Sequence, residues 1–159
     1  MISIAAALAL AAIAATPARS ARAAESAPPP LDVVVDCRCP DPVGQKFCAA
    51  LKDKLRADKS FHLTDAATGL GMGVHVFSID IWRGINDQLV DRMSAVSVAF
   101  TIFSDKLPGE IYEDSSVFRV GIDATGAMSD KVSAALGQIA TVNAGAFAQM
   151  RAPAKTGNH

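Results

Sequence analysis

The sequence has few aromatic residues and no excess of charge of either sign. Aromatic side chains make up 6% of the 159 residues, with one Trp and one Tyr. The 15 basic and 16 acidic side chains leave a formal charge of −1, so the chain lacks the basic surface that binding to nucleic acid or anionic membranes requires. Half of the residues are nevertheless hydrophobic, which excludes a wholly disordered chain and predicts a folded domain.

The hydrophobic run near the N-terminus is too short to span a bilayer. Ile4–Ala15 is apolar throughout, whereas a membrane-spanning helix needs about 20 such residues. Small residues at Ala21 and Ala23 fit a signal-peptide cleavage site, as do Thr16 and Ala18, although no basic residue precedes the run. The alternatives are an anchor helix or a misassigned start codon. We predict a cleaved signal peptide and a periplasmic or secreted protein with no membrane span after cleavage.

The chain divides into four segments. The signal peptide is assigned to residues 1–23, and residues 24–30 contain three consecutive prolines, which favour an extended spacer. The last residues, 151–159, are polar and without periodicity, as is typical of a disordered tail. A single domain is therefore expected over residues 31–150.

Apolar residues at alternate positions predict strands, and apolar residues three or four positions apart predict helices. The order β-α-β-β-β-β-α has too few helices to cover both faces of a sheet. We therefore predict an α+β fold, a two-layer sandwich of one mixed sheet of about five strands with two helices on one face. The expected strands are residues 31–37, 61–63, 72–82, 94–104 and 116–123, and the expected helices are 42–58 and 129–150.

Only three cysteines are present, and in an oxidising compartment they predict one disulfide. Cys37 has the inward parity of the first strand, and Cys48 lies about two turns into the first helix. We therefore favour Cys37–Cys48, with Cys39–Cys48 as the alternative. The spacing matches no zinc motif and no Cys-x-x-Cys redox motif, so a metal or redox site that recruits Cys37, Cys39, Cys48 and His62 is the weaker reading.

No pattern of residues in the sequence predicts a catalytic site. There is no Gly-x-Ser-x-Gly elbow and no Walker loop, and the glycines at 69, 71 and 73 precede a strand instead of following one. We predict no cofactor, no metal and no catalytic residue. The rival hypothesis is a thiol-dependent enzyme with Cys39 as nucleophile and His62 as its base.

One face of the predicted sheet has no helix to cover it. Alternate residues of the strand 72–82 point to opposite faces of the sheet. The face that contains Ser78 and Asp80 is the more polar of the two, so we assign it to the uncovered side. This face is then partly apolar, which marks an interaction site unless residues 83–93 cover it. The candidate interaction residues are Val74, Val76, Trp82, Phe103 and Arg119.

Residues 48–63 combine a helix of spaced leucines, a Ser-Phe pair and a strand. Together with the strands SAVSVAFTIF and FRVGID and the helix SDKVSAALGQI, they resemble the amino-terminal domain of the Tol–Pal translocation protein and the curli-secretion and penicillin-binding-protein activator lipoproteins. The resemblance covers about 90 residues as a pattern of elements. The chain departs from it in having no lipobox and no Glu-Arg pair after the strand at Phe61. The resemblance implies a non-enzymatic envelope protein that binds another envelope protein or self-associates, and it transfers no functional residue.

Overall fold

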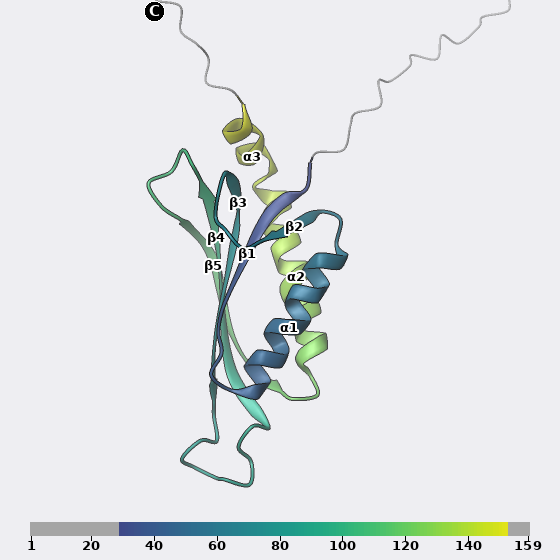
Figure 1. Ribbon diagram of the computed structural model, residues 1–159, viewed down its shortest axis with the longest axis vertical. Helices are drawn as coiled ribbons and strands as arrows, with labels where there is room; N and C mark the ends of the chain where they lie inside the picture. The colour runs from purple at the N-terminus through teal and green to yellow at the C-terminus, as the bar shows by residue number, and fades with distance from the viewer. Residues whose placement is uncertain (1–28, 153–159) are drawn as a thin grey trace, which may run out of the picture.

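The computed structural model describes residues 29–152, in which one sheet carries all its helices on a single face (Figure 1). The predicted signal peptide, residues 24–28 of the spacer and residues 153–159 of the tail lie outside this range. The elements are β1 (Leu31–Arg38), α1 (Pro42–Ala57), β2 (Phe61–Thr64), β3 (Leu70–Asp80), β4 (Met93–Ser104), β5 (Ile111–Gly121), α2 (Thr125–Val142) and α3 (Ala144–Arg151).

The five strands form a mixed sheet in the order β2-β1-β3-β4-β5. β1 lies parallel to β2 and to β3, and α1 is the crossover between the parallel strands β1 and β2. β3, β4 and β5 form an antiparallel meander. The predicted α+β class with one mixed five-stranded sheet is confirmed.

The start of α1 follows from its local sequence. The Asp41 carboxylate accepts a hydrogen bond from the backbone N–H of Gly44, and Pro42 occupies the first helical position, where an N–H has no partner to lose. The buried residues of this helix fall three or four positions apart, so one stripe faces the sheet. These residues are Val43, Gly44, Phe47, Cys48, Leu51 and Leu55.

The core lies between the helices and the inner face of the sheet. Phe47 of α1 packs edge-on against Phe118 of β5, with ring centroids 6.1 Å apart. Alternate residues of the central strands complete this core, because successive side chains of a strand point to opposite faces. They are Val33 and Val35 of β1, Met72, Val74 and Val76 of β3, and Val96, Val98, Phe100 and Ile102 of β4.

A buried polar cluster joins α1 to the sheet. Asp41 is 1% exposed, and its carboxylate accepts hydrogen bonds from the hydroxyls of Ser78 on β3 and Ser94 on β4. Burial by itself raises the pKa of Asp41, but the hydrogen bonds from Ser78, Ser94 and the Gly44 N–H outweigh it, so the pKa is lowered overall. Asp41 is therefore a buried, charged helix cap whose hydrogen bonds are satisfied by two strands.

The C-terminal helix is interrupted where the sequence predicted one continuous helix over 129–150. α2 ends at Val142, and α3 begins at Ala144. The Asn143 side-chain amide donates to the Ile139 carbonyl at 3.1 Å and to Glu113 Oε2 at 3.1 Å. Asn competes for backbone hydrogen bonds in this way, which explains the break. In residues 29–152 no helix combines the length and the hydrophobicity needed to cross a bilayer.

Candidate interaction surface

The face of the sheet opposite the helices, here called the open face, carries no helix (Figure 1). The strand register identifies its residues, because residues paired across neighbouring strands point to the same side. The row His75–Ala99–Ser115 crosses β3, β4 and β5, and the next rows are Phe77–Ser97–Val117 and Ile79–Ala95–Arg119. β1 extends two of these rows with Asp36 and Arg38.

The centre of the open face is apolar. Phe77 is 52% exposed, Ile79 is 49% exposed and Val117 is 74% exposed, and together they form what we call the apolar patch. Ser97 of β4 stands between Phe77 and Val117 in the register, so a small side chain separates the two larger ones. The two large side chains of this row therefore lie on either side of a small one.

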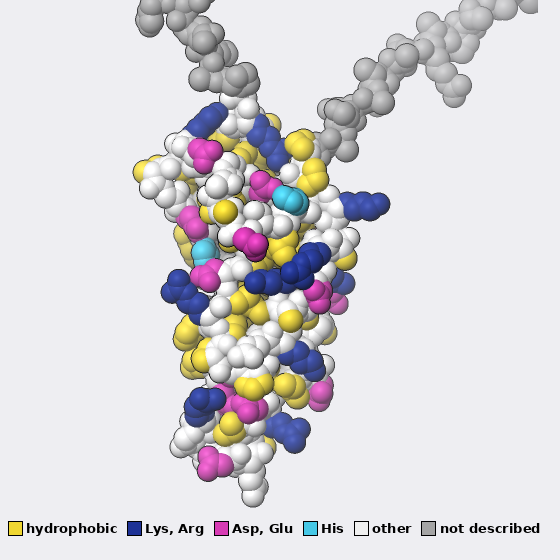
Figure 2. All heavy atoms as spheres, viewed as in Figure 1, with side chains coloured by type: hydrophobic (Ala, Val, Ile, Leu, Met, Phe, Trp, Pro, Cys, Tyr) yellow, Lys and Arg dark blue, Asp and Glu magenta, His cyan; other side chains and the backbone are white. Residues whose placement is uncertain are grey.

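Carboxylates and histidines occupy the end of the open face where β1 begins, and we call this the acidic end. Glu110 Oε2 lies 2.7 Å from His75 Nε2 and accepts a hydrogen bond from the Thr101 hydroxyl at 2.6 Å. Nearby, Asp32 Oδ1 lies 2.8 Å from His62 Nδ1. Figure 2 shows two histidine side chains in the upper half of the molecule, each beside carboxylates.

The Glu110 cluster depends on a glycine. A Cβ on Gly73 would lie 2.3 Å from Thr101 Oγ1 and 3.0 Å from His75 Nε2, so a larger residue would displace both groups. The Thr101 hydrogen bond is the main reason that the pKa of Glu110 is lowered, and the nearby His75 acts in the same direction against the effect of burial. The charged side chains of the acidic end are therefore held in place by these hydrogen bonds and by the close packing at Gly73.

The other end of the open face carries arginines, and we call it the basic end. Arg38 Nε lies 3.2 Å from Asp36 Oδ2, but both side chains are so exposed that this ion pair contributes little stability. Arg119 is exposed, and no carboxylate in residues 29–152 pairs with it. Arg38 lies in the row of Phe77 and Arg119 in the row of Ile79, so these cations flank the apolar patch, and the acidic end lies further along the strands.

Two of the predicted interaction residues lie on the opposite face. Val74 is fully buried and Val76 is 2% exposed, and both belong to the helix-side core. The prediction was wrong because it took Ser78 as a sign of solvent, whereas Ser78 is buried against Asp41. The exposed apolar residues of β3 are instead Phe77 and Ile79, which the predicted interaction set does not contain.

The other three predicted interaction residues have different outcomes. Phe103 has open-face parity but is 4% exposed, so it is not available to a partner. A Cβ on Gly71 would lie 2.5 Å from the Phe103 ring, which shows that the ring packs down on this glycine. Trp82 is half-buried in the segment after β3, and Arg119 is exposed on the open face.

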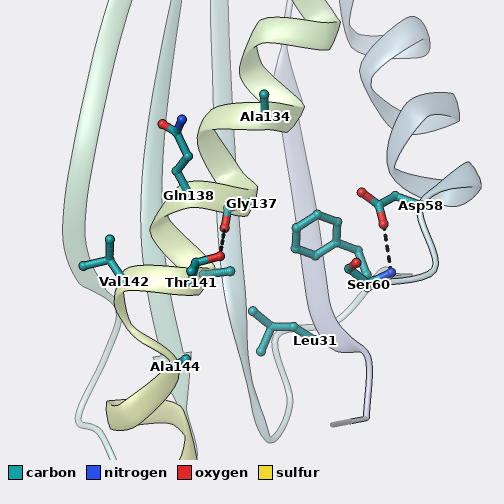
Figure 3. A pocket seen from close by; sticks show the side chains of 11 residues that line it. Leu31, Asp58, Ser60, Ala134, Gly137, Gln138, Thr141, Val142 and Ala144 are labelled. Atoms are coloured by element: carbon teal, nitrogen blue, oxygen red, sulfur yellow. Dashed lines mark hydrogen bonds between the residues drawn. The ribbon is translucent and has the colours of Figure 1, made fainter. Parts of the chain in front are cut away.

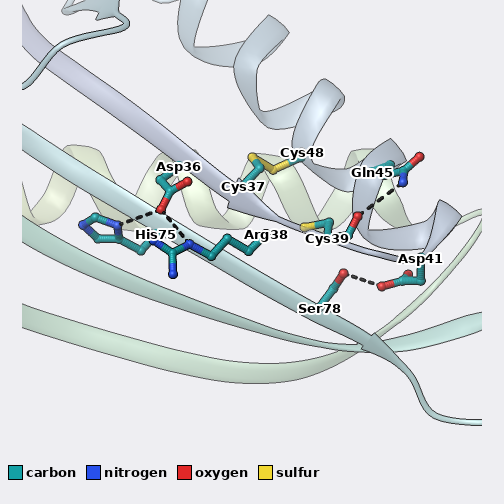
Figure 4. Close-up of a disulfide and its surroundings, with 9 residues drawn as sticks. All are labelled: Asp36, Cys37, Arg38, Cys39, Asp41, Gln45, Cys48, His75 and Ser78. Atoms are coloured by element: carbon teal, nitrogen blue, oxygen red, sulfur yellow. Dashed lines mark hydrogen bonds and ion pairs between the residues drawn. A yellow bond between two sulfur atoms is a disulfide. The ribbon is translucent and has the colours of Figure 1, made fainter.

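Cys37 and Cys48 form a disulfide whose Cα atoms are 6.4 Å apart, and Figure 4 shows it between the end of β1 and α1. It is the pair that the sequence analysis favoured over Cys39–Cys48. Cys39 is free and half-buried, and burial is the main cause of its raised pKa, while a hydrogen bond with Ser78 acts in the opposite direction. A thiol with a raised pKa is a poor nucleophile, since the thiolate is the reactive form.

The structure does not bring the predicted thiol and imidazole together. His62 pairs with Asp32 at the start of β1, and Cys39 follows the end of the same strand. Asp32 and Cys39 are seven positions apart, so at about 3.3 Å per residue His62 and Cys39 lie roughly 20 Å from each other along the strand. Within residues 29–152 no group of three or more His, Cys, Asp or Glu side chains has an arrangement that could hold a metal ion.

Comparison of the chain with protein-family models and with curated proteins finds no match.

Proposed function

We propose that this protein is an exported, non-enzymatic assembly module that acts through protein contacts at its open face. The observation that carries this proposal is the apolar patch, in which Phe77, Ile79 and Val117 are each about half exposed or more. A contiguous apolar surface with charged ends is typical of an interaction site. The two cysteines joined in a disulfide and the N-terminal sequence pattern support export, because disulfides persist in oxidising compartments.

The distribution of charge favours a second copy of this chain as the partner. A two-fold axis that lies across the strands would stack two open faces with their strands antiparallel. This rotation places the basic end of each copy over the acidic end of the other, so opposite charges meet. A rotation that kept the strands parallel would place like charges together.

In such a pairing the apolar patch would lie close to the centre. Arg119 lies in the row of Ile79, and Tyr112 lies in the row of Gly73 at the acidic end. These rows are six residues apart on β3, which is about 20 Å. Their midpoint lies within one residue of Phe77, so the two patches would cover each other. The same rotation sets Arg38 of each copy over Asp36 of the other.

The size of the open face predicts weak association. Strands about 4.8 Å apart and about nine residues long present at most roughly 700 Å² of sheet face. A stable interface buries about 800 Å² on each partner, so we expect a dimer that forms only at high protein concentration.

Sedimentation equilibrium over a wide range of concentrations tests the proposal. Phe77→Asp and Val117→Asp should abolish dimerisation without unfolding the protein, because both side chains are exposed. Val142→Asp is the matched control, since Val142 is 83% exposed on the helical layer. Arg119→Glu should weaken the dimer, and Arg119→Lys should retain it.

Two results would separate the parts of this proposal. If the wild-type protein stays monomeric at every concentration, the second copy is excluded as the partner. Affinity capture from an envelope extract with wild type and Phe77→Asp then decides whether the open face binds a different protein. If Phe77→Asp captures the same proteins as wild type, the open face is not the contact surface.

A further inference from the structure

An apolar groove lies at the end of the molecule where β1 and β2 begin, away from the apolar patch. It runs between α2 on one side and the α1–β2 turn on the other, and its volume is about 850 Å³. A second hollow of about 430 Å³ shares Leu31, Ser60, Ala140 and Ala144 with it and extends it along α3. Because the two hollows share these residues we treat them as one groove, and each has a volume in the range of small-molecule sites.

The groove exists because α2 presents small residues where it passes the sheet. Ala134, Gly137 and Thr141 of α2 line it at intervals of three or four positions, which is one face of that helix, and Ala144 at the start of α3 continues the wall (Figure 3). A Cβ on Gly137 would meet no atom within 4 Å, so this position opens into the groove. Leu31, Phe61 and Phe147 are buried side chains that line the groove.

The groove has cations at one end. Lys59 in the α1–β2 turn and Arg151 at the end of α3 both line the extension. Neither side chain makes an ion pair within residues 29–152. The one carboxylate that lines the groove belongs to Asp58, and it already accepts a hydrogen bond from the Ser60 N–H at 2.9 Å. Apolar walls and two unpaired cations from different elements complement a molecule with an apolar chain and an anionic head.

The groove offers little to a peptide backbone. Its long wall is α2, whose backbone N–H groups along this stretch are paired inside the helix, and only carbonyls of its last turn lack a regular helical partner. An extended peptide would leave most of its own amides without partners there, whereas a hydrocarbon chain has no such groups to satisfy. The lining therefore favours an acyl chain over a polypeptide.

We propose that this groove binds an acidic amphiphile with a single acyl chain, with the chain along α2 and the anionic head between Lys59 and Arg151. The site is independent of the open face and does not rest on the function proposed above.

Displacement of the fluorescent fatty acid cis-parinaric acid from the full chain tests this proposal. Palmitate should displace the probe at low micromolar concentration. Methyl palmitate has the same chain without the charge, so it should be about tenfold weaker if each cation contributes as an exposed ion pair. Palmitoyl lysophosphatidylglycerol distinguishes the source of the anion, because tighter displacement by it than by palmitate indicates a phosphate head.

Variants on α2 test the location. Gly137→Leu should weaken binding by at least about tenfold, since it overfills the groove. Thr141→Leu fills a neighbouring part of the wall and serves if the first variant folds poorly. Ala127→Leu adds a leucine to an exposed position near the start of the same helix and should bind like wild type.

Variants of Lys59 and Arg151 test whether these side chains bind the anionic head of the ligand. Lys59→Ala and Arg151→Ala should each weaken palmitate by about two- to fivefold and leave methyl palmitate unchanged. Lys59→Arg should restore the affinity. Phe77→Asp, on the open face, should bind palmitate normally even where it abolishes assembly.

The proposal is overturned by any of three results. The first is that the wild-type protein shows no saturable binding of the probe. The second is that Gly137→Leu and Thr141→Leu, both folded by circular dichroism, bind as well as wild type. The third is that methyl palmitate competes as well as palmitate, because the anionic head would then have no role.

Discussion

The buried carboxylate of Asp41 accepts a hydrogen bond from the hydroxyl of Ser78, and this contact ties the first turn of α1 to the end of β3. The same carboxylate caps α1 and also accepts from Ser94 on β4. One side chain thus connects the helical layer to two neighbouring strands. Because Ser78 points to Asp41, its neighbours Phe77 and Ile79 point to the open face.

Replacing Asp41 should therefore destabilise the protein strongly. Asp41→Ala removes a helix cap and leaves the buried Ser78 and Ser94 hydroxyls without their acceptor, so we expect a loss of about 3 kcal/mol in the free energy of unfolding. Urea denaturation measures this. Asp53→Ala is the control, because Asp53 is exposed on the same helix and should change stability by less than about 0.5 kcal/mol. A similar loss for both variants would contradict the role given to Asp41.

Acid should destabilise the protein through Asp41 and Glu110. Both carboxyls have lowered pKa values in the folded state, from ordinary values of 3.8 and 4.5. Their contribution is therefore complete above about pH 5 and is lost as the pH falls through the folded-state pKa values. Thermal melting from pH 6 down to about pH 2 should show a fall that is smaller in Asp41→Asn, whose side chain does not titrate. An equal fall in that variant would show that other groups dominate.

Loss of the Cys37–Cys48 disulfide should destabilise the protein but leave the open face unchanged. The bond links residues 11 positions apart, and a loop of this size contributes about 2–3 kcal/mol. Cys48→Ser should show this loss by chemical denaturation, and Cys39→Ser, which leaves the bond intact, should not. Non-reducing peptide mapping of the wild-type protein should find Cys37 linked to Cys48. Linkage of Cys48 to Cys39 would contradict the structure.

A carboxylate introduced on the helix-side face of the sheet should unfold the protein, whereas one introduced on the open face should not. Phe100 is 2% exposed in the helix-side core, so Phe100→Asp should prevent folding by burying an unpaired charge. Phe77 lies three rows away and points to the opposite side, onto the open face, so Phe77→Asp should melt within a few degrees of wild type. Circular dichroism melting compares them directly. If both variants unfold alike, the open face is covered in solution.

Gly73 should not tolerate a larger side chain. The new atoms of Gly73→Val would collide with Thr101 Oγ1 and displace Glu110, so we expect a loss of about 1–3 kcal/mol. Gly109→Ala is the control, since a Cβ there meets nothing within 4 Å. Thermal melting of the two variants at pH 7 distinguishes them, and equal stability would show that the acidic end rearranges freely.

Local sequence alone determined the elements and their layers. The alternation in β4, the Asp-Pro start of α1 and the spacing of its apolar residues are each contained within a few residues of the chain. For this reason the order of the strands and helices along the chain and the single mixed sheet can be predicted from the sequence, which also favours Cys37–Cys48 over Cys39–Cys48. The end of α2 cannot be predicted in this way, because the Asn143 side chain also bonds to Glu113, which lies 30 positions away.

Tertiary structure decided which face of β3 is exposed and which residues remain available on it. Ser78 reads as a solvent-facing residue in the sequence, yet it is buried because Asp41, 37 positions earlier, satisfies its hydroxyl. Phe103 reads as exposed, yet it is buried against Gly71 of the neighbouring strand. The groove along α2 likewise depends on where small residues meet another element. A strand's own sequence states the polarity of each side chain, and the cost of burying that side chain is set by the partner that the fold supplies.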